Sequence, residues 1–205
     1  MTKIDLTYYT SRENLPEGYR HGRSTIVQIL WHFTSALLFE TQFFPLYVLK
    51  VHVLRKFGAR VGDHVRIKPG VTIKYPWYLE MGDHVWIGER AWLDCTSKLK
   101  IGSHVVISQG AFLCCGSHDW NDPGMGGLTR PIAIEDGVWI CAFARIGLGL
   151  KIGEDAVILM GAVVVQDCEP SGIYQGHPAE KVGQRKVRDY PGPKRDTSRT
   201  TLATG

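Results

Sequence analysis

The sequence predicts an all-β fold, a parallel β-helix of about five triangular coils, from three observations. Between Val61 and Cys168 an aliphatic residue returns every six positions. A second residue, usually small, follows four positions after it. A period of six matches neither the 3.6-residue turn of an α-helix nor the two-residue alternation of a half-buried strand. It matches a triangular solenoid, in which each side takes six residues, the aliphatic side chain points inward and the small one lies near a corner.

The register of these repeats defines the coils. Three hexads close one coil of 18 residues, and successive coils stack at the parallel-strand spacing of about 4.8 Å. The expected coils are 61–78, 81–98, 101–118, 134–151 and 152–169. The fifteen inward positions are Val61, Ile67, Ile73, Met81, Ile87, Leu93, Ile101, Ile107, Leu113, Ile134, Ile140, Ile146, Ile152, Ile158 and Val164. The second positions are Val65, Val71, Val85, Ala91, Ser97, Val105, Ala111, Ser117, Val138, Ala144, Ala156, Ala162 and Cys168, with Trp77 and Leu150 as exceptions.

Several short motifs narrow the family. They are Phe57-Gly58-Ala59, Tyr75-Pro76-Trp77, Gly116-Ser117-His118-Asp119-Trp120, Arg130-Pro131-Ile132, Val138-Trp139-Ile140 and Gly176-His177-Pro178-Ala179. On these motifs, over roughly residues 50 to 188, the chain resembles the left-handed β-helix acyltransferases. Within them it is similar to the maltose- and galactoside-type sugar O-acetyltransferases, and especially to the colanic-acid type. The resemblance implies a left-handed solenoid, an exception to the right-handed crossover of most parallel strands.

Composition divides the rest of the chain into flanking segments. Residues 1–58 are expected to form an N-terminal arm followed by apolar helices, and residues 59–170 the β-helix with a loop at 119–133. That loop holds a proline and a Gly-Met-Gly-Gly run, which cannot continue a strand ladder. Residues 171–188 are expected to pack back on the prism as a strand and a short helix. Residues 189–205, rich in Pro, Ser and Thr, are expected to be disordered.

The N-terminal helices have two candidate partners. Ser24 is a candidate N-cap for a helix over 26–39, and a second apolar segment covers 45–54. Glu40 and a proline interrupt the apolar run, so its pieces are shorter than the ~20 residues of a membrane span. We expect the helices to cover the first coil, because a stacked sheet must protect its exposed edge. The alternative is that residues 24–54 lay a surplus apolar face on the inner surface of a membrane.

Overall composition bounds the function classes. The 205-residue chain is 44% apolar, enough to bury a core in one domain. Its net charge of +4 is mild, so a nucleic-acid groove is not expected. The five cysteines are odd in number and lack the spacing of a disulfide framework, and no signal-peptide pattern precedes them. We therefore expect a reduced, cytoplasmic location.

His118 is the leading catalytic candidate. It closes the third coil, where the solenoid fixes its backbone, and the loop that begins at Asp119 forms a wall beside it. A hydroxyl is a poor nucleophile at neutral pH, and a positioned imidazole that takes its proton contributes about 10²- to 10⁴-fold in rate. Asp119 is expected to orient the imidazole or to bind the acceptor. Glu135 is a second candidate for orienting it.

Two other groups of residues compete for a functional role. Cys114 and Cys115 raise the alternative of an acylated cysteine, but no base or helix N-terminus is evident that would lower a thiol pKa. Direct transfer to the acceptor is therefore predicted. The triplet His64, His84 and His104 would stack one imidazole per coil, and such a ladder can bind zinc. Because His tolerates the left-handed dihedrals of a corner, we interpret the triplet as structural and predict no metal site.

The resemblance implies acetyl-CoA as co-substrate and a homotrimer with the coenzyme in a groove between neighbouring prisms. By that resemblance Trp139, Ala142, Met160 and Gly161 line the pantetheine arm. Lys181 and Arg185 follow the Gly176-His177-Pro178-Ala179 motif and either meet the coenzyme phosphates or are solvated surface charges. The chain departs from its relatives at two places. It has Leu159-Met160 where they have Gly-Ala, and Val165-Gln166 where they have Thr-Lys.

The acceptor is expected to be a saccharide. Trp92, Asp94 and Trp120 are candidate contacts, because a sugar combines hydroxyl groups with an apolar face. The predicted function is thus an acetyl-CoA-dependent O-acetyltransferase acting on a sugar hydroxyl in polysaccharide or glycan synthesis. One alternative is an acetyltransferase for a non-sugar hydroxyl, such as that of an antibiotic or of serine. The other is a non-catalytic or metal-binding solenoid.

Overall fold

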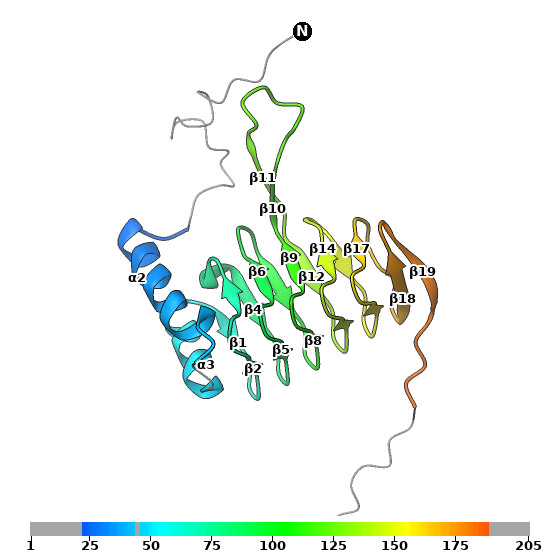
Figure 1. The fold of residues 1–205 in the computed structure, drawn as a ribbon, viewed down its shortest axis with the longest axis horizontal. Helices are drawn as coiled ribbons and strands as arrows, with labels where there is room; N and C mark the ends of the chain where they lie inside the picture. The colour runs from blue at the N-terminus through cyan, green and yellow to red at the C-terminus, as the bar shows by residue number, and fades with distance from the viewer. Residues whose placement is uncertain (1–21, 44–45, 189–205) are drawn as a thin grey trace, which may run out of the picture.

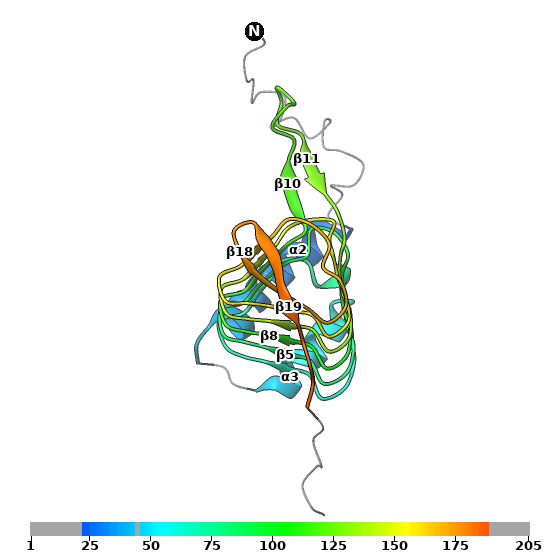
Figure 2. The same ribbon diagram turned by 90° about the vertical axis from the view of Figure 1, so that its right-hand side faces the viewer.

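A computed structural model of the chain describes residues 22–43 and 46–188. Three parallel sheets form the sides of a triangular prism (Figures 1 and 2). The chain visits the three sheets in turn, and each strand pairs in register with the strand one coil further on. Ile67, Ile87 and Ile107 stack in this way on one side of the prism. The fold is the left-handed parallel β-helix that the sequence predicted.

Each sheet takes one short strand from every coil. Sheet A contains β1 (Arg60–Val61), β4 (Leu79–Met81), β7 (Leu99–Ile101), β12 (Ile132–Ile134) and β15 (Lys151–Ile152). Sheet B contains β2 (Arg66–Ile67), β5 (Trp86–Ile87), β8 (Val106–Ile107), β13 (Trp139–Ile140), β16 (Val157–Ile158), β18 (Gly172–Gly176) and β19 (Ala179–Gln184). Sheet C contains β3 (Thr72–Ile73), β6 (Trp92–Asp94), β9 (Phe112–Cys114), β14 (Arg145–Ile146) and β17 (Val163–Val164).

The core lies inside the prism. All fifteen predicted inward side chains are buried, with at most 8% of any residue exposed. The smaller residues four positions later are buried as well, apart from Ser97 and Ser117, which are half-buried. Five coils are complete, and a bridge between Ile152 and Cys168 begins a sixth, which β18 continues. The hexad pattern was therefore a correct guide to the core.

Two corners of the prism are built from backbone in the left-handed region. Such a φ is strained for most side chains, and Gly, His, Asn and Asp tolerate it best. The corner between sheets A and B stacks His64, His84, His104, Gly137, Asp155 and Ser171, all with φ between +55° and +69°. The corner between sheets B and C, called the B–C corner below, stacks Gly70, Arg90, Gly110, Phe143 and Gly161. The left-handed conformation expected for the histidine triplet is thus confirmed.

The C-terminal end of the prism is closed by a β-hairpin. Strand β18 pairs with β16 on one side and antiparallel with β19 on the other. The expected short helix between residues 173 and 187 is wrong, because β19 occupies that segment. The backbone groups on the free edge of β18 need partners, and a returning strand supplies them where a helix would not.

The opposite end is covered by helices α2 (Thr25–Ser35) and α3 (Tyr47–Lys56), with a π-helical turn, η3 (Ala36–Glu40), after α2 (Figure 1). The indole of Trp31 is buried and its Nε1 donates to the carbonyl oxygen of Ile73, 2.9 Å away. Phe39 and Leu54 are fully buried beside it. Ser24 does stand at the N-cap of α2, but its side chain forms no capping hydrogen bond within the described residues.

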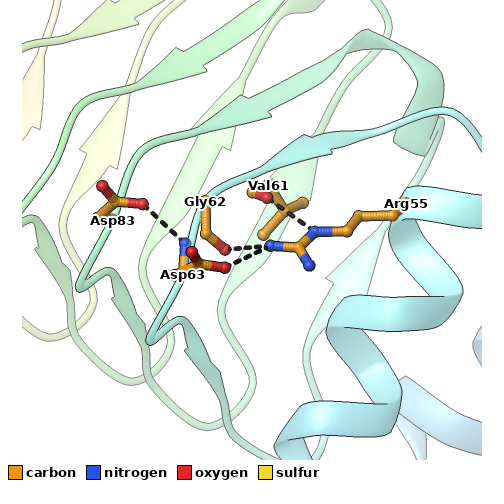
Figure 3. A network of polar contacts seen from close by, with 5 residues as sticks. All are labelled: Arg55, Val61, Gly62, Asp63 and Asp83. Atoms are coloured by element: carbon orange, nitrogen blue, oxygen red, sulfur yellow. Dashed lines mark hydrogen bonds and ion pairs between the residues drawn. The ribbon is translucent and has the colours of Figure 1, made fainter.

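Arg55 joins α3 to the first coil (Figure 3). Its guanidinium donates to the carbonyl oxygens of Val61 and Gly62 at 2.9 and 2.8 Å, and it pairs with the Asp63 carboxylate at 3.0 Å. The backbone N–H of Asp63 donates in turn to Asp83 of the next coil, 2.7 Å away. The carbonyl groups of Val61 and Gly62, in the first coil of the prism, thus gain a hydrogen-bond donor from α3.

The outward side of α2 is apolar. Ile26, Ile29, Leu30 and Phe33 of α2, and Leu37 of η3, are between 52% and 70% exposed. The spacing of the four residues in α2 places them on one face of that helix. We call these five residues the apolar stripe. Neither α2 nor α3, nor any other helix in the described ranges, has the length and apolar character to cross a membrane.

Lys50 carries a charge into the interface between α3 and the prism. The residue is fully buried, and its Nζ donates to the carbonyl oxygen of Lys68 at 3.2 Å. Burial lowers the pKa of Lys50 from 10.5 to about 8. Because the unfolded chain binds the proton more tightly, the buried charge destabilises the fold fully below pH 8. The penalty is relieved as the pH rises from 8 towards 10.5.

Lys50→Met is therefore expected to stabilise the protein at pH 7 by about 2 kcal/mol. Removing the buried charge gains roughly 3 kcal/mol, from the difference in pKa between the folded and unfolded states. Losing the hydrogen bond to Lys68 costs about 1 kcal/mol. Urea unfolding of both proteins at several pH values measures the difference, which should shrink above pH 8. Lys56→Met, on the exposed side of the same helix, should change stability by less than about 0.5 kcal/mol. A Lys50→Met protein less stable than wild type at pH 7 would contradict the expectation.

Candidate functional site

The segment after the third coil forms an antiparallel hairpin that projects from the prism (Figures 1 and 2). Strand β10 (Gly116–His118) pairs with β11 (Gly127–Thr129), and His118 lies opposite Gly127. We call these strands and the turn 119–126 the arm. The chain leaves the prism earlier than predicted, after Cys115, whose carbonyl oxygen accepts a hydrogen bond from the Arg130 N–H at 2.9 Å. His118 is thus on the arm and not at the end of the coil, because the loop provides a partner strand for residues 116–118.

The imidazole of His118 is oriented by the backbone of the arm. Its Nδ1 lies 2.8 Å from the carbonyl oxygen of Met125. A carbonyl oxygen only accepts hydrogen bonds, so Nδ1 carries the proton and donates it. The neutral ring then has its lone pair on Nε2, the atom required to take a proton from a hydroxyl. The side chain is half-buried.

The two carboxylates expected to orient His118 have other partners. Asp119 Oδ1 accepts a hydrogen bond from the Asn121 N–H at 2.9 Å, within the turn of the arm. Glu135 follows strand β12 of sheet A and pairs with Lys151 at 2.7 Å, and this contact holds the pKa of Glu135 below its usual value. The group that contacts Nδ1 of His118 is therefore the backbone carbonyl of Met125, and not the carboxylate expected from the sequence. Every residue has a backbone carbonyl, so residue types do not indicate such a contact.

The cysteines near the arm are held as thiols. Burial, with the nearby Asp94 carboxylate, raises the pKa of Cys115 to about 12. Burial also raises the pKa of Cys114, whose Sγ donates to the carbonyl oxygen of Gly116 at 3.0 Å. A thiolate is the nucleophilic form of cysteine, and these surroundings disfavour it.

Asp94 lies at the base of the arm. It is only 6% exposed, its carboxylate lies 3.4 Å from the Lys74 ammonium, and its Oδ2 accepts from the Thr96 hydroxyl at 3.4 Å. A Cβ added to Gly116 would lie 3.4 Å from Oδ2, so the carboxylate adjoins the first residue of the arm. The Oδ1 atom is within ion-pair range of Lys74 but has no hydrogen-bond partner among the described residues. A hydroxyl donor would satisfy it.

The two tryptophans predicted to contact the acceptor lie in different places. Trp92 is on the outer face of sheet C, 47% exposed, with its ring 4.9 Å from that of Phe112. It borders an open hollow of about 390 Å³ between α2 and sheet C. The other lining residues include Trp31, His32, Lys74 and Tyr75. Trp120 is on the arm and 79% exposed, and it does not line this hollow.

Four residues predicted to bind the coenzyme lie along or beside the B–C corner. The Gly161 N–H donates to the carbonyl oxygen of Ala142 at 3.0 Å, which places them in adjacent coils of that corner. Met160 is 73% exposed, and a Cβ on Gly161 would meet no atom within 4 Å, so the surface there is open. Trp139 lies three residues before Ala142, and its Nε1 donates to the hydroxyl of Ser108 at 3.0 Å. No sequence pattern marks Ser108, because it meets Trp139 only when the coils stack.

The two basic residues assigned to the coenzyme phosphates are not brought to this corner. Arg185 donates to the carbonyl oxygens of Gly137 and Asp155 at 2.7 and 3.1 Å, at the corner between sheets A and B. Its guanidinium anchors the end of the C-terminal hairpin there. Lys181 pairs with Glu169 at 2.5 Å, and this hydrogen bond raises the pKa of Lys181.

The histidine ladder stacks as a column of rings. The centroids of His64 and His84 are 4.7 Å apart, those of His84 and His104 are 5.0 Å apart, and the planes differ by 10° and 9°. Stacked rings present faces to one another and do not converge their nitrogens on one point. Within residues 22–43 and 46–188, no group of three or more His, Cys, Asp or Glu side chains is placed to hold a metal ion.

Comparison with known proteins gives matches in sequence over most of the chain. The chain is 34% identical over 172 residues to a protein of Escherichia coli (strain K12) that carries the name colanic acid biosynthesis acetyltransferase WcaF. The match covers 84% of this chain and 94% of the relative. A protein of the same name from Shigella flexneri is equally similar. No protein-family model matches the chain.

Solved structures share the fold. A hexapeptide-repeat acetyltransferase of Vibrio cholerae, in complex with acetyl-CoA, has a TM-score of 0.74 at 22% identity and covers 85% of this chain and 98% of its own. A galactoside acetyltransferase in complex with coenzyme A has a TM-score of 0.70 at 20% identity, covering 92% and 98%. A maltose O-acetyltransferase of Clostridium difficile 630 has a TM-score of 0.66 at 20% identity, covering 80% and 90%.

Proposed function

The chain belongs to the family of the colanic-acid-type hexapeptide-repeat acetyltransferases, and from that membership we propose that it transfers the acetyl group of acetyl-CoA to a saccharide hydroxyl in polysaccharide or glycan synthesis. The observation that carries the proposal is the orientation of His118, whose Nδ1 donates to the Met125 carbonyl oxygen, so that in the neutral ring the lone pair is on Nε2. The acetyl-CoA bound to the Vibrio cholerae relative supports the donor. The galactoside and maltose acetyltransferases support a sugar acceptor.

In the proposed reaction the acceptor hydroxyl attacks the thioester carbonyl carbon while Nε2 of His118 takes its proton. A carbon–oxygen bond forms, the carbon–sulfur bond breaks, and the thiolate that leaves takes the proton back from the imidazolium. The products are the acetylated saccharide and coenzyme A. The raised pKa of both thiols beside the arm supports direct transfer without an acyl-cysteine.

We place the donor along the B–C corner and the acceptor at the base of the arm. Ala142, Met160 and Gly161 offer an open strip for an extended chain such as pantetheine. Asp94 Oδ1 offers a buried oxygen to an acceptor hydroxyl, and Trp92 offers an aromatic surface to the apolar face of a sugar. We assign Asp119 and Trp120, which lie on the arm, to the far side of the acceptor.

We propose that the working form is a homotrimer. The outer face of sheet A is covered by ion pairs, in which Glu80 contacts Arg60 and Lys98, and Glu135 contacts Lys151. The outer faces of sheets B and C instead expose tryptophans, of which Trp86 is 38% exposed, Trp139 45% and Trp92 47%. Aromatic surface of this kind favours contact with neighbouring prisms. We place the reaction in the cytoplasm, because all five cysteines are free thiols and suit a reducing compartment.

Peripheral membrane contact through residues 24–54 is proposed for the apolar stripe. Of the five Lys and Arg residues between 22 and 60, Arg23 and Lys56 are exposed and suit anionic lipids, whereas Lys50 is buried and Arg55 and Arg60 pair with Asp63 and Glu80. We expect the protein to sediment with phosphatidylglycerol vesicles. Because each buried Phe or Leu contributes about 2 kcal/mol, a Phe33→Glu, Leu37→Glu double variant should bind at least roughly tenfold more weakly. Val182→Glu, an exposed apolar residue at the other end of the prism, is the control. Equal sedimentation of the double variant would reject the contact.

The function is tested by thiol release from acetyl-CoA in the presence of a panel of acceptors. Acceptor-dependent release with a saccharide, and mass addition of one acetyl group to that saccharide, is the expected result. Release only with serine or with an aminoglycoside would assign a non-sugar hydroxyl. No release with any acceptor would favour a non-catalytic solenoid and contradict the proposal.

A further inference from the structure

We propose that Asp122 is a positioning residue that fixes the tautomer of His118 through a single peptide group, an inference that rests on the proposed role of His118 as base. Asp122 lies in the turn of the arm, four residues from His118, and nothing in the sequence motifs marks it. Both oxygens of its carboxylate accept hydrogen bonds from backbone N–H groups of the turn, and one of these hydrogen bonds leads on to the imidazole through a peptide group.

The connection runs through the peptide bond between Met125 and Gly126. Asp122 Oδ2 accepts the Gly126 N–H at 2.9 Å. The carbonyl oxygen of the same planar peptide group is that of Met125, which accepts from His118 Nδ1 at 2.8 Å. Carboxylate, peptide and imidazole thus form one chain of hydrogen bonds. A carboxylate on the N–H end polarises the peptide and strengthens the carbonyl as an acceptor.

The rest of the turn holds that peptide in place. Asp122 Oδ1 accepts the Gly124 N–H at 2.9 Å, and the Asp122 carbonyl oxygen accepts the Met125 N–H at 2.8 Å. Met125 has a φ of +50°, an unfavourable conformation for a residue with a side chain, so it must be held by its surroundings. A Cβ on Gly126 would lie 2.6 Å from Asp122 Oδ2, so the close approach of the carboxylate requires glycine there.

An amide in place of the carboxylate breaks this arrangement. Asn has one acceptor oxygen and one NH₂ group, so it can serve only one of the two glycine N–H groups and presents a donor to the other. Without the negative charge, and with only one of the two glycine N–H groups bonded, the Met125 carbonyl is less fixed, and the His118 ring can place its proton on Nε2. A ring protonated on Nε2 cannot accept the proton of a hydroxyl.

The test measures the tautomer and the turnover separately. Long-range ¹H–¹⁵N spectra of the His118 ring, at a pH of about 8.5 where free imidazoles are neutral, should show Nδ1–H in wild type and a mixture of tautomers in Asp122→Asn. Gly126→Ala, which displaces the carboxylate but keeps its charge, should give the same mixture. Asp136→Asn is the matched control, because Asp136 Oδ1 accepts the Ser103 N–H at 2.8 Å outside the arm.

In the turnover assay Asp122→Asn should lower kcat about tenfold or more and leave the KM for acetyl-CoA unchanged, with Asp136→Asn at the wild-type rate. Combined with His118→Ala, it should cause no further loss, because it acts through the imidazole. A further loss in that background, or a single Nδ1–H tautomer in Asp122→Asn, would overturn the inference. If wild type transfers no acetyl group, the proposed function fails, and the spectra still decide whether Asp122 sets the tautomer.

Discussion

His118→Ala should lower kcat by about 10²- to 10⁴-fold, the range that a general base contributes. The KM for acetyl-CoA should change by less than about twofold, because we propose that the donor binds along the B–C corner and not on the arm. Thermal stability should be near that of wild type, since the side chain is half-buried on a hairpin outside the prism core. Thiol release at saturating acceptor, measured beside the melting temperature, checks all three expectations.

The matched control is His52→Ala, which removes an exposed imidazole on α3 and should leave turnover unchanged. A His118→Ala protein that retains turnover within twofold of wild type would refute the base assignment. A large rise in KM at constant kcat would instead assign His118 to binding.

Trp31→Ala should lower the free energy of unfolding by about 4 kcal/mol, as expected for a buried Trp truncated to Ala. The indole is 3% exposed and contacts the rings of Phe39 and Phe57 at centroid distances of 5.4 and 5.0 Å. Its loss leaves a cavity between α2 and the first coil. It also leaves the Ile73 carbonyl oxygen without its indole donor. Urea unfolding measures the loss.

Two comparison variants separate packing from the hydrogen bond. Trp31→Phe keeps most of the apolar area and should lose about 1 to 2 kcal/mol. Phe33→Ala, two residues on and 68% exposed, should change stability by less than about 0.5 kcal/mol in the absence of lipid. If Trp31→Ala lost no more than Phe33→Ala, the helices would not contribute to closing the prism.

The fold was predictable because the interior of a narrow prism admits only certain side chains. Ile87, Ile107 and Ile140 stack in successive coils and face the same narrow interior. Only side chains of similar volume fit there, so an aliphatic residue recurs every six positions. The ends of the prism are constrained differently. The edge of β18 needs hydrogen-bond partners, and any sequence can supply them from its backbone, so the sequence of residues 179–184 does not distinguish the returning strand β19 from a short helix.

The site was less predictable, because much of it consists of backbone. The motif around His118 marks that residue as a candidate, but no residue type in the sequence indicates that the Met125 backbone carbonyl orients it. Arg185 was assigned to the coenzyme from its charge and its place after Gly176 to Ala179. The register of β19 with β18 carries it to the other edge of sheet B. A one-dimensional motif cannot specify that placement.

The stacking of the coils is not interrupted where the arm is inserted. Ile101 pairs with Ile134, Ile107 with Ile140 and Leu113 with Ile146, so the third and fourth coils stack directly across the insertion. Substitutions, and even changes of length, in the turn 119–126 are therefore insulated from the stability of the prism. The sequence of this turn can therefore change in evolution without loss of the fold.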